Sequence, residues 1–348
     1  MKKTRLLQVI YFLPILAFAQ PDKNKSAIDL SQQFASTITA QDLKTHLTIV
    51  ASKEMEGRET GTQGQRNAAQ YIKNQFESLG LLPAPGTENY LQYFPLPYVD
   101  SAKFKKGLVN SNACNVVGLI EGSDKKDEYV FITGHYDHLG MRNDKIYYGA
   151  DDDGSGTCAV IEIAEAFAKA KAAGHGPRRT IVCMTVSGEE KGLWGSDYYS
   201  EHPLFPLEKT SVDLNIDMVG RKDPNRKKGD NNNYVYVIGH DKLSSELPII
   251  NESVNNQFTK LEFDYKYDDP NDNERIFYRS DHYNFARKGV PILFFFDGIH
   301  EDYHKTSDTV DKINFDLYEK RIQMVFYTAW EIANRDEMLK RDIPLPLE

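Results

Sequence analysis

The chain has 348 residues, with 42 lysines and arginines against 51 aspartates and glutamates, so its formal net charge is -9 at pH 7. Apolar residues make up 40% of the sequence and charged residues 27%, which excludes a disordered chain and allows a sizeable core. The acidic balance argues against nucleic acid as a partner, and a mean hydropathy of -0.55 excludes a bundle of membrane spans.

The first residues have the pattern of an export signal. Lys2, Lys3 and Arg5 precede an apolar run over 6–19 that is shorter than the ~20 residues of a membrane-spanning helix. The run ends in the small-x-small pattern Ala17-Phe18-Ala19, and no cysteine follows that would indicate a lipid anchor. We therefore expect residues 1–19 to be a signal peptide cut after Ala19, and the mature chain to be periplasmic or secreted, without an integral membrane segment.

Apolar spacing in the next part of the chain predicts two helices, over 26–52 and 62–79. The glycine-rich residues 57–61 between them form a predicted turn. Short strand-like runs follow near 90–98 and 113–121.

Strands and helices then alternate up to the C-terminus. The predicted strands are 129–133, 180–186, 212–217, 234–239 and 291–296, and the predicted helices are 155–173, 192–201 and 314–334. This alternation predicts an α/β fold, a three-layer sandwich around a mixed, largely parallel central sheet. Residues 20–348 contain neither an internal repeat nor a linker, so we expect a single catalytic domain with a surface loop at 223–233.

The three cysteines are Cys114, Cys158 and Cys183. Two of them lie in apolar, strand-like runs and the third lies near a predicted helix start, so we expect small buried core residues. Export would permit one disulfide, but the sequence does not select a pair. No CxxC pair exists, which argues against a metal site made of cysteines.

Five polar clusters are predicted to lie at the carboxyl ends of strands. They are residues 134–138, 149–156, 187–190, 215–217 and 303–304. In an open α/β sheet these ends converge on one crevice, where ligands bind. Converging His, Asp and Glu side chains indicate a metal, because packed carboxylates would otherwise repel one another. Histidines with carboxylates and no thiolate suit zinc in a hydrolytic site.

Each cluster taken alone also has a structural interpretation. The aspartates 151–153 could cap a helix, Glu189 and Glu190 could form a solvated turn, and a lone histidine is more often structural than a ligand. The joint placement of all five clusters favours the functional interpretation.

Several stretches match a known family in the same order along the chain. They read EGRETG, GHYDHLG, GADDDGSG, SGEEKGLWGS, NIDMVGR, SDHYNFARKGVP and DYHKTSDT. With them the chain resembles the di-zinc aminopeptidases, a family that includes bacterial secreted enzymes and whose wider membership includes glutamate carboxypeptidases, glutaminyl cyclases and inactive receptor-like proteins. The resemblance extends from about Leu43 to the C-terminal helix and implies a zinc-exopeptidase fold. The protease-associated domain that larger relatives insert before His135 is not found.

The resemblance implies two Zn²⁺ ions per chain and assigns their ligands. His135 and Asp217 would bind one zinc, Glu190 and His304 would bind the other, and Asp152 would bridge the two ions.

The resemblance also assigns residues to the reaction. Glu189 matches the general base that takes a proton from the zinc-bridging water. Asp137 matches the residue that orients the imidazole of His135. Tyr303 is a candidate donor to the oxyanion, with a packed aromatic residue as the equally weighted alternative.

Other polar residues of these motifs are expected outside the ligand set. Asp151 and Asp153 are neighbours of the bridging residue, and the pair at 281–282 is expected either to be structural or to support a ligand residue from behind. His138 and His300 are candidate substrate contacts. The acidic stretch 268–274 could bind calcium, although a solvated loop is favoured. The histidines with no candidate partners in the sequence are His46, His175, His202 and His240.

These features predict an exported metallo-aminopeptidase that removes N-terminal residues from peptide substrates. A carboxypeptidase or dipeptidase of the same family is the main alternative, followed by a single-zinc glutaminyl cyclase. A receptor-like protein without metals is disfavoured because all five ligand positions and the base are present. Side-chain preference and oligomeric state stay open.

Overall fold

A computed structural model of the chain describes residues 30–269 and 271–345. Its central sheet contains β1 (Leu82–Pro83), β2 (Leu91–Pro95), β3 (Asn112–Ile120), β4 (Lys125–His135), β7 (Arg179–Val186), β8 (Thr210–Ile216), β9 (Tyr234–Ile238), β10 (Glu262–Asp264) and β11 (Ile292–Phe296). The strand order is β1-β3-β7-β4-β8-β11-β9-β10, and β2 also pairs with β3. A separate hairpin joins β5 (Met141–Arg142) to β6 (Lys145–Ile146).

The four strands in the middle of the sheet are parallel. Strand β4 pairs with β7 on one side and β8 on the other, and β8 pairs with β11. The pairs of β3 with β7 and of β9 with β11 are antiparallel, so the sheet is mixed as predicted. The parallel strands are buried on both faces, which is why they read as unbroken apolar runs in the sequence.

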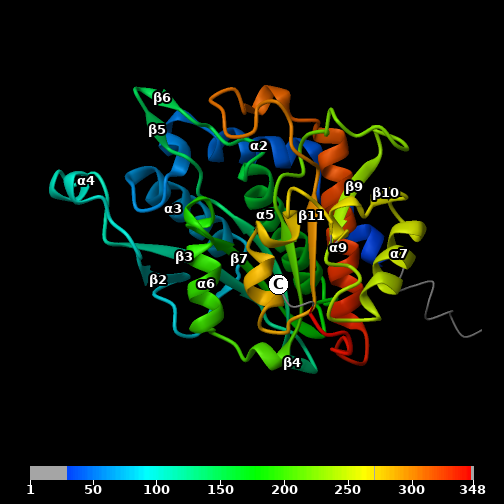
Figure 1. Ribbon diagram of the computed structural model, residues 1–348. Helices are drawn as coiled ribbons and strands as arrows, with labels where there is room; N and C mark the ends of the chain where they lie inside the picture. The colour runs from blue at the N-terminus through cyan, green and yellow to red at the C-terminus, as the bar shows by residue number, and fades with distance from the viewer. Residues whose placement is uncertain (1–29, 270, 346–348) are drawn as a thin grey trace, which may run out of the picture.

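Helices cover both faces of this sheet (Figure 1). One face carries α2 (Ala40–Val50), α3 (Gln63–Ser78), α5 (Gly154–Ala172), α7 (Leu247–Gln257) and α9 (Phe315–Asn334); the other carries α6 (Trp194–Glu201) and α8 (His282–Ala286). The short α4 (Ser101–Lys105) lies apart from these layers, at the edge next to β2. Along β4, Val130 and Ile132 join the first core and Phe131 joins the second, as strand alternation requires. The predicted three-layer sandwich is confirmed.

One predicted helix is wrong in its extent. The described part of 26–52 is not continuous, because helical residues 30–35 are separated from α2 by a turn. Thr39 has an extended backbone and its hydroxyl accepts a hydrogen bond from Asp42 N at 3.1 Å, which caps a new helix at Ala40. The other predicted elements are present with ends shifted by a few residues, and 223–233 contains neither helix nor strand.

Two further expectations concern the thiols and the membrane. Cys114, Cys158 and Cys183 are free and buried, so the interpretation as core residues is confirmed. Within 30–269 and 271–345, no helix is both long and apolar enough to cross a membrane. The predicted signal peptide and its cleavage site lie outside the described residues.

The turn between α2 and α3 is built around a buried arginine. Arg58 Nε donates to the carbonyl of Tyr136 at 2.7 Å, and its terminal nitrogens donate to Val50, Tyr148 and Gly149 at 2.7–2.9 Å. Gly57 precedes it at φ +66, and a Cβ there would lie 2.4 Å from a backbone oxygen. The EGRETG stretch thus fixes the segments that follow β4 and precede α5.

We expect Arg58→Ala to lower the free energy of unfolding by about 3–5 kcal/mol, because three buried carbonyls and one partly buried carbonyl lose a charged donor. Urea denaturation would measure this loss. Arg66→Ala is the matched control, since Arg66 is only partly buried and contacts its own turn and helix, and it should cost less than about 1 kcal/mol. Equal losses in the two variants would contradict this role for Arg58.

Candidate metal centre

The predicted site residues lie at one edge of the sheet. His135 ends β4, residues 187–190 follow β7, and Asp217 follows β8. The aspartates 151–153 lie directly before α5, and the loop after β11 carries His304. Since β4, β7 and β8 run parallel, their carboxyl ends open on the same side, and the structure brings these side chains together as expected.

A first group surrounds Nε2 of His135. Asp152 Oδ1 lies 3.4 Å from this atom, Asp217 Oδ1 lies 3.6 Å from it, and Glu189 Oε2 lies 3.9 Å from it. The imidazole is buried, and its Nε2 has no hydrogen-bond partner. Three carboxylates therefore face one unpartnered nitrogen at distances longer than hydrogen bonds.

A second group shares Asp152 with the first. Asp152 Oδ2 lies 3.1 Å from His304 Nε2, which is also 3.2 Å from Glu190 Oε2. His138 joins this group, because its Nδ1 lies 2.7 Å from Glu190 Oε1 and 3.8 Å from Asp152 Oδ2. The sequence predicts His138 only as a candidate substrate contact. Its position three residues after His135, just beyond a strand end, is the sequence signal that could have identified it.

The donor set fits zinc. Two ligands that each lie 2.0–2.1 Å from a tetrahedral ion are about 3.4 Å from each other. Asp152 and Asp217 lie 3.4 and 3.6 Å from His135 Nε2, which matches this spacing. In the second group, the contacts of His304 with Asp152 and Glu190, at 3.1 and 3.2 Å, are close to it.

The titration behaviour of the groups also favours a bound cation. Burial raises the pKa of Glu189 well above its usual value. Burial lowers the pKa of His135, but the carboxylates of Asp217 and Glu189 raise it well above its usual range. For His304, hydrogen bonds to Asp152 and Glu190 outweigh burial and raise the pKa to about 10. So many buried carboxylates require positive charge to stay ionised, and divalent ions supply it.

Asp137 connects His135 to the backbone of Glu189. Its backbone oxygen lies 3.1 Å from His135 Nδ1 and its Oδ1 lies 3.6 Å from the same nitrogen. Oδ1 also accepts from the backbone N–H of Glu189 at 3.2 Å, while Oδ2 accepts from the hydroxyl of Thr60 at 2.8 Å. The expected orienting role thus involves both the main chain and the carboxylate of Asp137.

We expect Asp137→Asn to weaken zinc binding by about 10–100-fold, because partners that orient a histidine ligand have effects of this size. Competition with a chromophoric chelator would measure the affinity. Thr60→Val removes the hydroxyl that donates to Asp137, so it should also weaken zinc binding, but by a smaller factor. An unchanged affinity in Asp137→Asn would show that the backbone oxygen alone orients His135.

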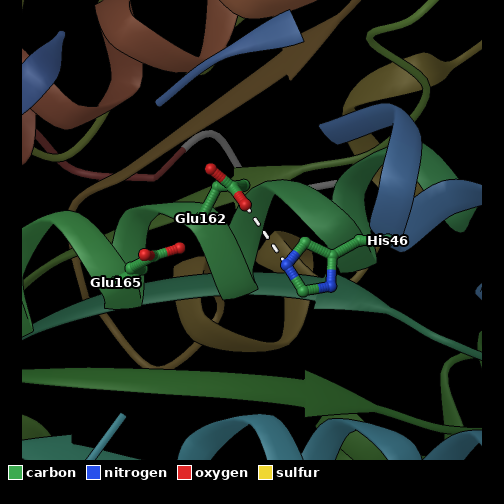
Figure 2. Close-up of side chains that lie close together, drawn as sticks. All are labelled: His46, Glu162 and Glu165. Atoms are coloured by element: carbon green, nitrogen blue, oxygen red, sulfur yellow. Dashed lines mark ion pairs between the residues drawn. The ribbon is translucent and has the colours of Figure 1, made fainter. Parts of the chain in front are cut away.

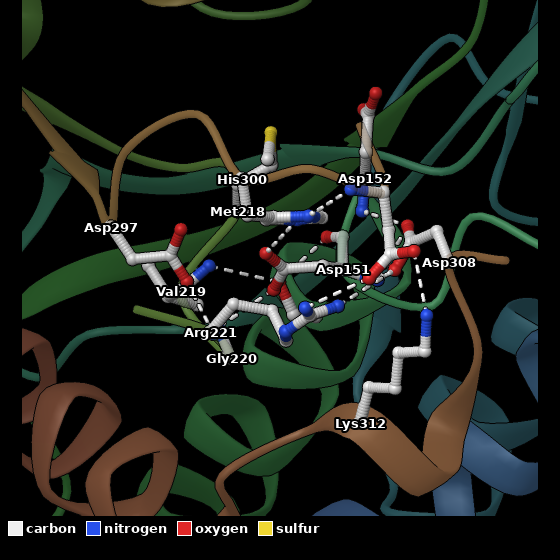
Figure 3. A network of polar contacts seen from close by, with 12 residues as sticks. Asp151, Asp152, Met218, Val219, Gly220, Arg221, Asp297, His300, Asp308 and Lys312 are labelled. Atoms are coloured by element: carbon white, nitrogen blue, oxygen red, sulfur yellow. Dashed lines mark hydrogen bonds and ion pairs between the residues drawn. The ribbon is translucent and has the colours of Figure 1, made fainter. Parts of the chain in front are cut away.

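A buried polar network holds the aspartate turn against the His304 loop (Figure 3). Asp308 accepts hydrogen bonds from the backbone N–H groups of Asp151 and Asp152 at 3.0 and 3.2 Å. His300 Nε2 lies 3.1 Å from Asp151 Oδ2, so His300 is bound within the protein rather than placed to contact substrate. Arg221, which follows β8, donates from Nη2 to Asp302 in the His304 loop at 3.0 Å.

The two aspartates beside Asp152 shape the backbone. Asp151 Oδ1 accepts from Gly220 N at 2.8 Å, and Asp153 accepts from Gly156 N at 2.7 Å as the N-cap of α5. Asp153 also accepts from the backbone N–H of His135 at 3.1 Å. Neither needs to bind a metal.

A cavity adjoins both groups. Asp152, Glu189 and Asp217 line it together with Tyr303 and Arg279. Its remaining walls are apolar and consist of Met218, Ile276, Phe294, Phe296 and Ile299. Tyr303 thus lies where a substrate would approach, and its ring also stacks on that of His304.

The remaining expectations concern residues near this site. Asp281 accepts from the hydroxyl of Ser196 and His282 Nε2 lies 2.8 Å from the carbonyl of Phe277, so the pair packs as a structural unit. In the acidic stretch, Asp269 and Asp272 accept hydrogen bonds from backbone N–H groups of their own loop, which favours the solvated loop over a calcium site.

Comparisons with known proteins indicate a family of peptidases. The sequence model of peptidase family M28 matches residues 115–329. A probable zinc metalloprotease of Pyrenophora tritici-repentis is 37% identical over 125 residues, which cover 33% of this chain and 24% of that protein. A probable glutamate carboxypeptidase of Arabidopsis thaliana is 38% identical over 104 residues, 30% of this chain and 14% of that protein. The matched regions thus span about a quarter or less of these curated relatives.

Among solved structures, an aminopeptidase from Aneurinibacillus sp. strain AM-1 is similar in fold, with a TM-score of 0.64 at 16% identity. The similarity covers 91% of this chain and 98% of that one.

Proposed function

Because the chain belongs to peptidase family M28, we propose that it is a zinc-dependent aminopeptidase that releases N-terminal residues from peptides. The observation that supports this most strongly is the position of Asp152 between the two groups. One of its oxygens faces His135 at 3.4 Å and the other faces His304 at 3.1 Å. A carboxylate placed in this way can hold two ions together, which is the arrangement of two-metal hydrolytic sites.

The five residues His135, Asp152, Glu190, Asp217 and His304 would hold two Zn²⁺ ions, with His138 available to the second. When bound, zinc polarises a carbonyl and lowers the pKa of water towards ~7.

The protein's own residues would perform the proton transfer and the positioning. Glu189 lines the cavity with its side chain 13% exposed, so it can take a proton from the attacking water and return it to the leaving amine. Tyr303 lines the same cavity, and its hydroxyl would donate to the developing oxyanion. Burial raises the pKa of Tyr303, so this hydroxyl keeps its proton.

The cavity also suits a free N-terminus. The carboxylates of Asp152, Glu189 and Asp217 in its lining would attract an ammonium group, and its apolar lining residues would accept a side chain. A peptide panel tests the proposal: purified protein should release the first amino acid from free peptides, and N-acetylation should suppress this at least tenfold. If acetylated peptides are cut equally well, the aminopeptidase proposal fails.

One feature favours a carboxypeptidase or dipeptidase as the second candidate. Arg279 lines the same cavity, with Nη2 3.4 Å from the Tyr303 hydroxyl, and its guanidinium could bind a substrate carboxylate. C-terminal amidation of the test peptides separates the two functions, because it should abolish cleavage by a carboxypeptidase and leave an aminopeptidase active. A single-zinc glutaminyl cyclase would instead bind one tight zinc and form a cyclic product.

We also propose that the protein is exported, on the basis of residues 1–19. N-terminal sequencing of the protein from the extracellular or periplasmic fraction should begin at Gln20. An uncleaved chain in the cytoplasm would contradict this.

A further inference from the structure

A third group of potential ligands lies in the helical layer, away from the candidate metal centre. It consists of His46 on α2 with Glu162 and Glu165 on α5, each offering one ligand atom within 4.8 Å of the others. Figure 2 shows the three side chains directed towards the same space between the two helices. Glu162 lies about 12 Å along α5 from its first residue, Gly154, at 1.5 Å per residue. His46 had no candidate partner in the sequence, because its partners belong to a different helix.

Glu162 is the unusual member of this group. Its side chain is 0% exposed, and His46 Nε2 lies 3.2 Å from Oε1. Neither of its oxygens accepts a hydrogen bond of normal geometry. A buried carboxylate without hydrogen bonds is costly, and a cation beside it would remove that cost.

His46 is oriented as metal-binding histidines are. Its Nδ1 lies 2.7 Å from the hydroxyl of Tyr71 on α3. When Nδ1 carries the proton and donates to this oxygen, the lone pair of Nε2 points towards Glu162. A histidine ligand usually has its second nitrogen fixed by such a hydrogen bond.

The other charges near the group are compatible with a cation. Burial raises the pKa of Glu162; His46 lowers it, while the carboxylates of Glu165 and Asp42 raise it further. Lys169 Nζ lies 2.6 Å from one oxygen of Glu165, and a carboxylate has a second oxygen for another partner. The side chains of His46 and Glu165 are 13% and 25% exposed, so an ion can reach the group from solvent.

We propose that His46, Glu162 and Glu165 form an additional site for a divalent first-row transition ion, with zinc as the probe, and that this ion joins α2 to α5. One imidazole and two carboxylates are ligands that zinc accepts, and water can complete the tetrahedron. The site is distinct from the candidate metal centre and would act on stability, since a bound ion would add ligand bonds between α2 and α5 to the His46–Glu162 contact already present.

Zinc titration of the full-length protein, with its candidate metal centre already loaded, tests this proposal. Calorimetry should show one further equivalent of zinc, and crystals soaked in zinc should give an anomalous peak between α2 and α5. His46→Ala should lose this equivalent and this peak while it retains the ions of the candidate metal centre. The absence of a peak at saturating zinc would overturn the proposal and leave the group as a buried ion pair.

Two further variants keep the test independent of folding defects. Glu165→Gln changes a partly exposed residue and should weaken the added equivalent at least tenfold without loss of helical circular dichroism. His175→Ala removes an exposed histidine that belongs to no group of potential ligands among the described residues, and it should retain the equivalent. An unchanged affinity in both His46→Ala and Glu165→Gln would also contradict the proposal.

Discussion

Glu189→Gln is expected to lower kcat by a factor of about 10²–10⁴ while the zinc content stays unchanged. Glutamine has the size of glutamate but cannot take a proton from water at neutral pH. Glu189 is the most distant of the three carboxylates from His135 Nε2, at 3.9 Å, and it lines the cavity, which suits a base better than a ligand. Steady-state kinetics together with metal analysis of the purified variant would measure both quantities.

The adjacent residue provides the contrasting variant. Glu190 lies 2.7 Å from His138 and 3.2 Å from His304, so Glu190→Gln should lower the zinc content as well as the activity. The reverse pattern, in which Glu189→Gln loses zinc and Glu190→Gln retains it, would exchange the roles of base and ligand. Metal content therefore decides the assignment, since distances alone place Glu189 with His135 and Asp217 in one group of potential ligands.

The sheet and its ligand-bearing edge could be predicted because their sequence signals are local. The strands of the parallel centre are buried on both faces, so each appears as an apolar run that ends in polar residues. The rule that parallel strand ends converge then brought His135, Glu190 and Asp217 together without any knowledge of distances. The family resemblance added the role of each residue.

Features that depend on a cap or a short turn were harder to predict. The break before α2 rests on one side chain, Thr39, whose hydroxyl binds a backbone N–H three residues later. The apolar spacing continues through this break, so periodicity alone extends the helix too far. The hairpin of β5 and β6 has strands of only two residues, too short to show alternation.

The contacts that His46 and Arg58 make with distant elements left no signal in the sequence, and that of His138 left only its spacing from His135. Nothing in the sequence around His46 indicates that it faces Glu162. Among residues 30–269 and 271–345, Arg58 pairs with backbone carbonyls rather than with a carboxylate that a charge pattern could reveal. The position of His138 depends on the turn after β4, which Arg58 fixes through the carbonyl of Tyr136. Such residues are placed by packing between helices and loops, and only the folded chain shows their partners.

Asp152→Asn is expected to remove at least one of the two zinc ions and to lower kcat/KM by about 10³-fold or more. Asp152 is the residue common to both groups, with one oxygen 3.4 Å from His135 and the other 3.1 Å from His304. Burial raises the pKa of Asp152, but its close contacts with these two histidines outweigh burial and hold the pKa well below its usual value, so its negative charge is available to both groups. The amide of asparagine is neutral, so it cannot supply this negative charge to either group. The loss of several kcal/mol of transition-state stabilisation corresponds to a rate factor of this size.

A variant of the neighbouring Asp153 tests whether zinc is lost because Asp152 bridges the ions or because this turn needs every acidic residue. Asp153→Asn removes a charge one residue away, but its carboxylate accepts hydrogen bonds from His135 N, Gly156 N and Met218 N rather than facing a histidine ring. The single oxygen of asparagine can still accept from Gly156 N and Met218 N, which both bind Oδ1, and only the bond from His135 N to Oδ2 is lost. Metal analysis of the two variants side by side should therefore show full zinc in Asp153→Asn and a deficit in Asp152→Asn. If both variants keep two zinc ions, Asp152 does not bridge them, and the two-metal arrangement must be held by the remaining ligands, with His138 as the replacement in the second group.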